Sequence, residues 1–437
     1  MTGRGNHLCL IGEQTYGYEV QADKGICVFD QRCVHDGKGP VNGVERPMCS
    51  YYQTRADALG SPYRTANYAL ILTTPPLLRG GKTQTLLADE AHNIEEVVAN
   101  NVSIYLSRRT YQRFGIRLPS YDEPAKWREW AKGQIPPRKP QQPDIGWKTV
   151  CENLTALGGV TDEGWVVSME EHGVKLEPLW GTEYVQPKLF GHGVDKYGGL
   201  ALPPGGVQKV MMTSATMMGA EYIADKLGLP DGSWDYLDLP STFPPAHRPI
   251  NYAPVVMMNN KAMEDGSPVR KQMMDAVDKV IEHYILSGAK AGLIHGVSNK
   301  YVEKLLTESR WKSIMSKEVE QHVRIIEAGG TSILVAANIA EGWDGKDDLC
   351  RFIILPKVPF PNLGDTRTRL RREDDERSFD HRTLVSVVQG AGRGVRHTTD
   401  VADTWILDRA WSILMNKRRT WLPKSFTDAY RQVNFPF

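Results

Sequence analysis

The chain has 437 residues, of which 41% are hydrophobic and 24% are charged, and its formal net charge is +1. This length allows two or three domains with sizeable cores, and the composition is that of an ordinary globular protein. A net charge so close to zero excludes a general attraction to nucleic acid, so any such binding must come from a local groove. No apolar run reaches the roughly 18 residues of a membrane helix, and the polar start is not a signal peptide. We therefore expect no membrane partner and a reducing, cytoplasmic setting.

Six cysteines are distributed unevenly along the chain. Cys151 and Cys350 stand alone and are predicted to be small buried hydrophobic residues. The other four lie within the first fifty residues, a segment rich in glycine and polar residues and poor in periodic pattern: Cys9, Cys27, Cys33 and Cys49. Such a composition is typical of a segment held together by a ligand rather than by a core.

Residues 51–99 show an α/β pattern. Tyr51–Leu59 is predicted to be a helix, and the short apolar runs Ala69–Leu72 and Thr85–Ala88 are predicted to be strands. Between 101 and 203 a proline-rich stretch and five tryptophans replace the periodic runs, which predicts an inserted, mostly helical subdomain. The strand Val207–Thr213 then returns to the first lobe.

A second α/β unit begins after residue 245, where predicted strands alternate with predicted helices. The alternation implies a parallel sheet with ligand groups on the loops that follow the strands. The strands are expected at Ala291–His295, Ser332–Ala336, Arg351–Leu355 and Thr404–Leu407, and the helices at Met273–Leu286, Lys300–Ser309 and near Thr383–Val388. We therefore divide the chain into segments 1–50, 51–100, 101–203, 204–245 and 246–437.

The tetrad Asp-Glu-Ala-His at positions 89–92 ends the apolar run Thr85–Ala88. An acidic pair at the carboxyl end of a buried strand is where nucleoside-triphosphate motors hold magnesium and position the attacking water. Asp89 suits the Mg²⁺ shell through water, since magnesium gives up its own water reluctantly. Glu90 would orient the attacking water, and His92 would relay the state of the nucleotide. The alternative is an exposed acidic turn in which Asp89 caps a helix at Asn93–Val98.

The block Gln-Gly-Ala-Gly-Arg-Gly-Val-Arg occupies positions 389–396. Arg393 and Arg396 are three residues apart and, if helical, share one face of the helix. They are candidates for arginine fingers on a nucleotide, with Gln389 as a further nucleotide-binding residue. The alternative is a solvated basic helix end.

Two further loops carry candidate groups. The hydroxyls of Ser214 and Thr216, in a Thr-Ser-Ala-Thr segment, can couple the two lobes. The acidic, glycine-flanked loop Glu-Gly-Trp-Asp-Gly at 341–345 follows a predicted strand and offers Gly342 and Asp344 to a nucleotide.

The order of these motifs resembles the XPD/DinG branch of the superfamily-two helicases. The likeness runs from Asn6 to about Arg409 and is thin across 100–200, where the family carries its arch insertion. The matching segments are Asn6–Cys9, Cys49–Tyr52, residues 89–93, Thr213–Thr216, Leu239–Phe243, Glu341–Gly345, Pro359–Asn362, Gln389–Arg396 and Ile406–Arg409. The resemblance implies an α/β protein with two RecA-like parallel-sheet motor lobes, an iron–sulfur segment and a mostly helical arch.

Members of that branch are ATP-driven helicases that move 5′ to 3′ on single-stranded DNA. The resemblance therefore implies ATP and Mg²⁺ as cofactors, single-stranded DNA as partner, and association with the nucleoid if the source is bacterial or a phage. Trp127, Trp130 and Trp147 could stack on bases or belong to the core.

By the same resemblance Cys9, Cys27, Cys33 and Cys49 would ligate a [4Fe–4S] cluster. Four thiolates is the number such a cluster needs, and the intervals of 17, 5 and 15 residues suit a cluster wrapped in loops. Zinc is the main alternative, although zinc sites usually contain a close Cys-x-x-Cys pair, which is absent here. Unligated thiols are the third possibility.

The chain departs from the family at the phosphate loop, GxxxxGK[ST]. The one Gly-Lys-Thr, at 81–83, has Pro76 where the first glycine belongs, and no helix fits between it and the acidic tetrad. We interpret it as a hairpin turn. The sequence thus predicts the carboxyl-terminal portion of a split or truncated ATP-dependent DNA helicase, with a first lobe that is completed by an amino-terminal fragment carrying the phosphate loop. The alternative is a non-hydrolytic, single-stranded DNA-binding or regulatory protein that keeps the helicase shell.

Overall fold

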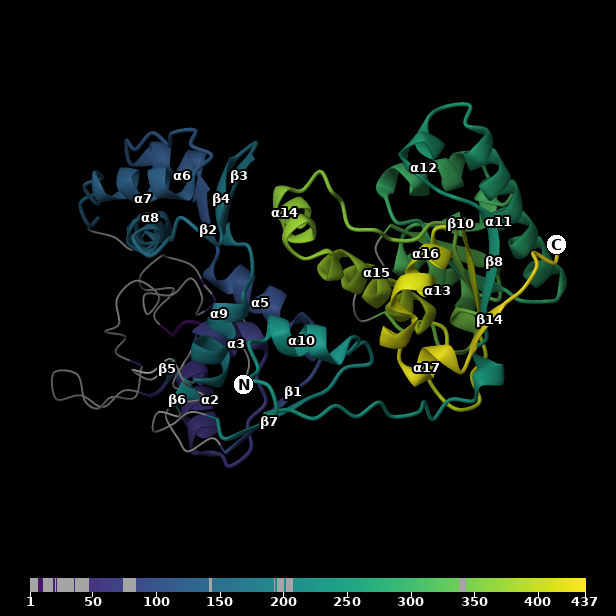
Figure 1. The fold of residues 1–437 in the computed structure, drawn as a ribbon, viewed down its shortest axis with the longest axis horizontal. Helices are drawn as coiled ribbons and strands as arrows, with labels where there is room; N and C mark the ends of the chain where they lie inside the picture. Colours follow the sequence, from purple (N-terminus) through teal and green to yellow (C-terminus); the bar gives the residue numbers. More distant parts are fainter. Residues whose placement is uncertain are drawn as a thin grey trace. The chain divides into compact units, whose positions relative to one another are not determined.

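The computed structural model describes residues 7–10, 19, 21, 35, 47–73, 84–140, 144–191, 193–194, 200–201, 207–337 and 343–437 (Figure 1). The chain forms two compact units, one of residues 1–213 and 224–230 and the other of residues 214–223 and 231–437. The finer division into five segments stays a prediction. No helix within the described ranges is both long enough and apolar enough to cross a membrane.

The elements of the first unit are α2 (Ser50–Gly60), α3 (Tyr68–Thr73), β1 (Thr85–Ala88), η3 (Ala91–Asn93), α5 (Ile94–Val102), β2 (Ile104–Ser107), α6 (Arg108–Arg113), α7 (Pro124–Lys132), α8 (Ile145–Leu157), β3 (Trp165–Glu170), β4 (Gly173–Pro178), α9 (Thr182–Tyr184), the π-helix η4 (Val185–Phe190), β5 (Gly193–Val194), β6 (Leu200–Ala201) and β7 (Lys209–Met212). Helix α10 (Ala220–Lys226) spans the boundary between the units.

Strands β1 and β7 pair in parallel, with Leu87 opposite Met211. Both strands were expected from the sequence, and both are confirmed. The expected helix at Tyr51–Leu59 is also confirmed, as α2. The Gly-Lys-Thr at 81–83, interpreted as a hairpin turn, lies outside the described residues.

The predicted strand Ala69–Leu72 is wrong, because this run belongs to helix α3. Asn67 starts the helix: its side-chain Oδ1 accepts from the Leu70 N–H at 2.8 Å, and its carbonyl accepts from the Ile71 N–H at 3.2 Å. Ile71 and Leu72 are buried, as they would be in a strand or in a helix. Four apolar residues are too few to show whether the hydrophobic pattern repeats with the period of a strand or of a helix.

The inserted segment holds the expected helices α6, α7 and α8, together with an antiparallel sheet of order β2-β4-β3 that the sequence did not reveal. Side chains from both parts form one core, in which Leu106, Trp127 and Leu176 are fully buried. The Trp127 indole N–H donates to the Tyr121 carbonyl at 2.9 Å. Trp127 is therefore a core residue, which removes it from the candidates for base stacking.

The elements of the second unit are η5 (Pro245–His247), β8 (Ile250–Val256), η6 (Asn260–Met263), α11 (Pro268–Leu286), β9 (Ala291–His295), α12 (Asn299–Glu308), η7 (Lys312–Ile314), β10 (Met315–Ser316), α13 (Val319–Glu327), β11 (Ser332–Ala336), η8 (Asp347–Leu349), β12 (Phe352–Leu355), α14 (Thr366–Asp374), α15 (Glu376–Ala391), β13 (Asp403–Asp408), α16 (Trp411–Arg418), η9 (Arg419–Trp421), α17 (Lys424–Thr427) and β14 (Tyr430–Gln432).

Within the described residues of this unit, seven strands form one sheet of order β10-β11-β9-β12-β13-β8-β14, and each adjacent pair is parallel. Successive side chains of a strand point to opposite faces. In β12, Ile354 packs with α11 and α12 on one face, and Ile353 packs with α15 and α16 on the other. The sheet is thus the middle layer between two helical layers, and the predicted α/β class with parallel-sheet lobes is confirmed.

Candidate functional site

The acidic pair follows β1 directly, and backbone pairing with β7 continues past the strand ends. The Thr213 N–H donates to the Ala88 carbonyl at 2.8 Å, and the Ala91 N–H donates to the Thr213 carbonyl at 3.0 Å. The Asp89 carboxylate accepts at Oδ1 from the Thr213 hydroxyl at 3.0 Å and from the Glu90 N–H at 2.9 Å. Asp89 is therefore held by the residue just before Ser214, rather than by an interaction that would cap helix α5.

Glu90 has a left-handed backbone with φ of 48°, which is uncommon for a residue with a side chain. Its Oε2 lies 3.3 Å from Nδ1 of His92, whose side chain is nearly buried. The Tyr68 hydroxyl donates to the Asp89 carbonyl at 2.5 Å. Burial raises the pKa of Tyr68 to about 12, and the charges of Asp89 and Glu90 add to the rise. No sequence pattern indicated Tyr68, because it lies just before the run Ala69–Leu72 that was predicted as a strand and is part of helix α3.

Ser214 and Thr216 form a compact turn in the second unit. The Thr216 N–H donates to the Ser214 Oγ at 3.0 Å, and the two hydroxyl oxygens lie 3.2 Å apart. Thr216 is buried and Ser214 is partly buried. The segment predicted to couple the lobes thus begins where the first unit ends, at Thr213.

The arginine block is helical only in its first residues, so its two arginines do not share a helix face. Helix α15 ends at Ala391, so Gln389 is helical and Arg393 and Arg396 are not. The glycines after Ala391 explain the difference, because they favour the end of a helix over its continuation. At Gly394 a Cβ atom would lie 2.5 Å from the Ala402 side chain, so the chain passes too closely there for any larger residue.

The arginine block contacts the predicted acidic loop. The Arg393 side chain donates from Nη1 to the Trp343 carbonyl at 3.3 Å. The Arg393 backbone carbonyl accepts from the Gly345 N–H at 3.2 Å. Arg396 Nη2 lies 2.7 Å from Oδ1 of Asp344. Two motifs chosen separately from the sequence therefore meet, although Gly342 lies outside the described residues. Since Asp344 is largely exposed, its pairing with Arg396 is screened and can be exchanged for another anion.

The register of two neighbouring strands explains this meeting. Residues 343–350 lead into β12 and residues 392–402 lead into β13, and these strands are parallel with Phe352 opposite Asp403. The two segments therefore enter the sheet side by side. From the sequence we expected the ligand groups on loops that follow strands. The arginine block instead lies on the segment that precedes strand β13.

His295 ends β9 and is only 6% exposed. Its Nδ1 has no hydrogen-bond partner among the described atoms. Burial, with a smaller contribution from the positive charge of Arg393, lowers the pKa of His295 to about 4. His295 is thus an electrostatic neighbour of the arginine block. In the sequence it lies at the end of the predicted strand Ala291–His295.

The predicted cluster ligands are only partly described. Cys49 is buried at the start of α2, and its N–H donates to the His35 carbonyl at 3.1 Å. Cys9 is partly buried. Cys27 and Cys33 lie outside the described residues, so the four-cysteine site stays a prediction.

Residues 271–429 match the family of helicase C-terminal domains. The ATP-dependent DNA helicase CHL1 of Vanderwaltozyma polyspora is 25% identical over 132 residues, covering 25% of this chain and 16% of that protein. The protein of the same name from Saccharomyces cerevisiae is 27% identical over 104 residues, covering 19% of this chain and 12% of that protein. The matched part of the chain thus spans less than a fifth of either relative.

A solved structure titled XPD helicase has a similar fold, with a TM-score of 0.54 and 14% identity. The similarity covers 90% of this chain and 77% of that structure. The second unit has a RecA-like parallel sheet, and residues 271–429 within it match the helicase C-terminal domain family. The resemblance of the chain to the XPD/DinG-type superfamily-two helicases is thereby confirmed.

His295 provides a test of the site's electrostatics by NMR titration. We expect its imidazole to titrate near pH 4 and Arg393→Ala to raise this pKa only modestly, because burial is the larger cause. The folded-state pKa lies below the ordinary value of about 6.5, so neutral His295 contributes stability above pH 6.5 that is lost as the pH falls through the folded pKa. The variant His295→Gln assigns the resonance. A His295 that is protonated at pH 6 would contradict the described burial.

Proposed function

We propose that this chain is the carboxyl-terminal portion of an ATP-driven DNA helicase that moves 5′ to 3′ on single-stranded DNA and acts with a partner polypeptide carrying the phosphate loop. The observation that carries the proposal lies in the second unit, where Arg393 and Arg396 contact residues 343–345 within a helicase C-terminal domain. A pair of guanidinium groups held at an acidic loop suits the charge that develops during phosphoryl transfer.

The first unit would supply the magnesium and the water. Asp89 would hold Mg²⁺ through water, while Glu90 orients the attacking water and His92 reports the state of the nucleotide. The bond between the Thr213 hydroxyl and Asp89, at 3.0 Å, supports coupling. A shift of Asp89 on hydrolysis would reach Ser214 and Thr216 through the adjoining backbone.

The exposed face of the β1–β7 pair supports a partner. Within the described residues these strands form a two-stranded parallel sheet, a structure that is not stable alone and is normally covered on both faces. Leu87 and Met211 lie opposite each other in the register and are 71% and 59% exposed. A partner that adds strands and helices to this sheet would bury both side chains and place its phosphate loop beside Asp89.

The cysteines Cys9, Cys27, Cys33 and Cys49 would hold a [4Fe–4S] cluster in the amino-terminal segment. The burial of Cys49 supports this assignment, because a thiolate that ligates a cluster is shielded from bulk water. The cluster would serve to shape the segment, which is rich in glycine and shows no periodic pattern of apolar residues.

The first test is reconstitution of the chain with a phosphate-loop polypeptide. We expect ATP hydrolysis stimulated by single-stranded DNA, reduced about a hundredfold or more in Glu90→Gln because the water loses its orienting carboxylate. The matched control is Glu171→Gln, which changes an exposed carboxylate in the turn between β3 and β4.

Full activity in Glu90→Gln would contradict this role, and a reconstituted pair without ATPase would count against the helicase. The competing function, a non-hydrolytic DNA-binding protein, requires single-strand binding that neither ATP nor Arg393→Ala changes. A DNA titration with and without nucleotide separates the two.

The second test concerns the partner surface. Leu87→Asp puts a charge where an apolar side chain would be buried, which removes about 2 kcal/mol of burial and weakens the partner's binding by at least about tenfold. Binding of the phosphate-loop polypeptide is measured by calorimetry. Leu286→Asp, at an exposed leucine at the end of α11, should leave the affinity unchanged. Equal affinities for both variants would remove the β1–β7 face as the docking surface.

The third test concerns the cluster. Protein purified without oxygen should be brown, with broad absorption near roughly 400 nm, and Cys27→Ser should lose both iron and colour. Cys151→Ser should keep them, since Cys151 lies on helix α8, far along the chain from the cysteine segment. A colourless protein that carries zinc would overturn the assignment.

A further inference from the structure

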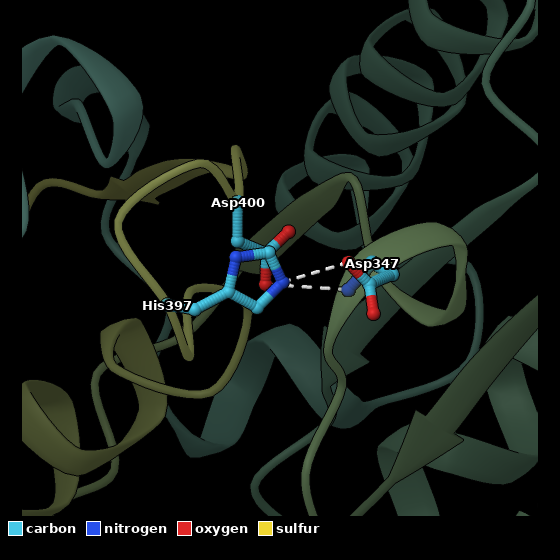
Figure 2. Close-up of side chains that lie close together, drawn as sticks. All are labelled: Asp347, His397 and Asp400. Carbon is cyan, nitrogen blue, oxygen red and sulfur yellow. Dashed lines mark hydrogen bonds and ion pairs between the residues drawn. The ribbon is translucent and has the colours of Figure 1, made fainter.

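Three side chains that no predicted motif includes meet beside Arg396: Asp347, His397 and Asp400 (Figure 2). Their ligand atoms all lie within 4.8 Å of one another, as in a cation site. His397 Nε2 lies 2.8 Å from Oδ1 of Asp347, and both of these side chains are largely exposed. The Asp400 side chain, in contrast, is fully buried.

The hydrogen bonds of Asp400 argue against a cation. Its Oδ1 accepts from the Val401 N–H at 3.0 Å and from Arg351 Nη1 at 3.1 Å. Its Oδ2 accepts from the Asp347 N–H and from the Arg396 N–H, both at 3.2 Å. An ionised carboxylate has about four acceptor positions, and four donors occupy those of Asp400. A metal ion would have to displace one of them.

Two of these donors belong to the segments that form the candidate site. The Arg396 N–H lies in the arginine block, and the Asp347 N–H lies three residues after Asp344. Asp347 has a left-handed backbone with φ of 55°, a conformation that persists only where its surroundings enforce it. One buried carboxylate therefore ties the backbones of both segments together, while Arg351 balances its charge.

We propose that Asp400 is a positioning residue that fixes the backbone of Arg396 against the 344–347 segment, so that the Arg396 guanidinium is held ready for the nucleotide. The proposal rests on the proposed function for the role of Arg396. Asp400 touches no substrate and acts only through the backbone atoms that it binds. The exposed pair of His397 and Asp347 braces the same two segments from the solvent side.

The variant Asp400→Asn keeps the size of the side chain but turns one oxygen acceptor into an N–H donor that faces N–H donors. We expect amide hydrogen exchange over residues 344–349 and 393–400 to quicken by at least about tenfold, because buried charge-assisted hydrogen bonds are lost. The matched control is Asp348→Asn. Asp348 lies 2.9 Å from Nη2 of the same Arg351, but from an exposed position.

The second readout is ATPase of the reconstituted pair. Asp400→Asn should lower kcat about tenfold to a hundredfold with little change in KM, since a displaced arginine acts in the transition state. In an Arg396→Ala background it should cause no further loss. A purely structural residue would lower activity in both backgrounds by the same factor.

Hydrogen exchange uses the chain alone, so it decides the backbone role even if the pair shows no ATPase and the helicase proposal fails. Unchanged exchange in Asp400→Asn, or losses that multiply with Arg396→Ala, would overturn the proposal. If Asp400→Asn does not fold, Asp400→Glu moves the same charge by one methylene, and it should show the same exchange pattern and the same dependence on Arg396.

Discussion

The parallel pairing of β12 with β13 is the constraint on which the candidate site depends. Phe352 lies opposite Asp403, and the Asp403 N–H donates to the Arg351 carbonyl at 3.2 Å, so the segments that precede the two strands enter the sheet together. Each segment carries one part of the site, and apart from the single turn of η8 neither has regular structure that could hold it in place alone. The sheet supplies their alignment, and the four hydrogen bonds of Asp400 hold them there.

The sequence predicted the central strands well because they are buried on both faces and form continuous apolar runs. The bounds of β9 and β11 agree with the expected ranges. Strand β8 was not among the predicted strands, and it contains Pro254. The chain tolerates this proline where the β8–β13 register shifts, since a ladder hydrogen bond is not needed at an irregularity. Helix α3 was mistaken for a strand because local sequence cannot separate the two over four residues.

The candidate site was predictable in its parts but not in its connections. Residue type and order indicated Asp89, Arg393 and Arg396. The contacts of Thr213 with Asp89 and of Asp400 with Arg396 depend on strand register, which a single sequence does not reveal. The two arginines do not share a helix face, because α15 ends at Ala391, just before Gly392 and ahead of both of them. The sequence alone therefore does not predict the tertiary contacts: which loops meet, and which buried side chains hold them together.

The central proposal is that the guanidinium groups of Arg393 and Arg396 reach the phosphates of a bound nucleotide. The most direct measurement is a cryo-electron microscopy structure of the chain with its phosphate-loop partner and ADP–aluminium fluoride, a mimic of the transferred phosphoryl group. We expect Arg396 to leave Asp344 and both guanidinium groups to lie within hydrogen-bond distance of the fluoride atoms. A bound nucleotide with Arg396 still on Asp344, and neither arginine near it, would contradict the account.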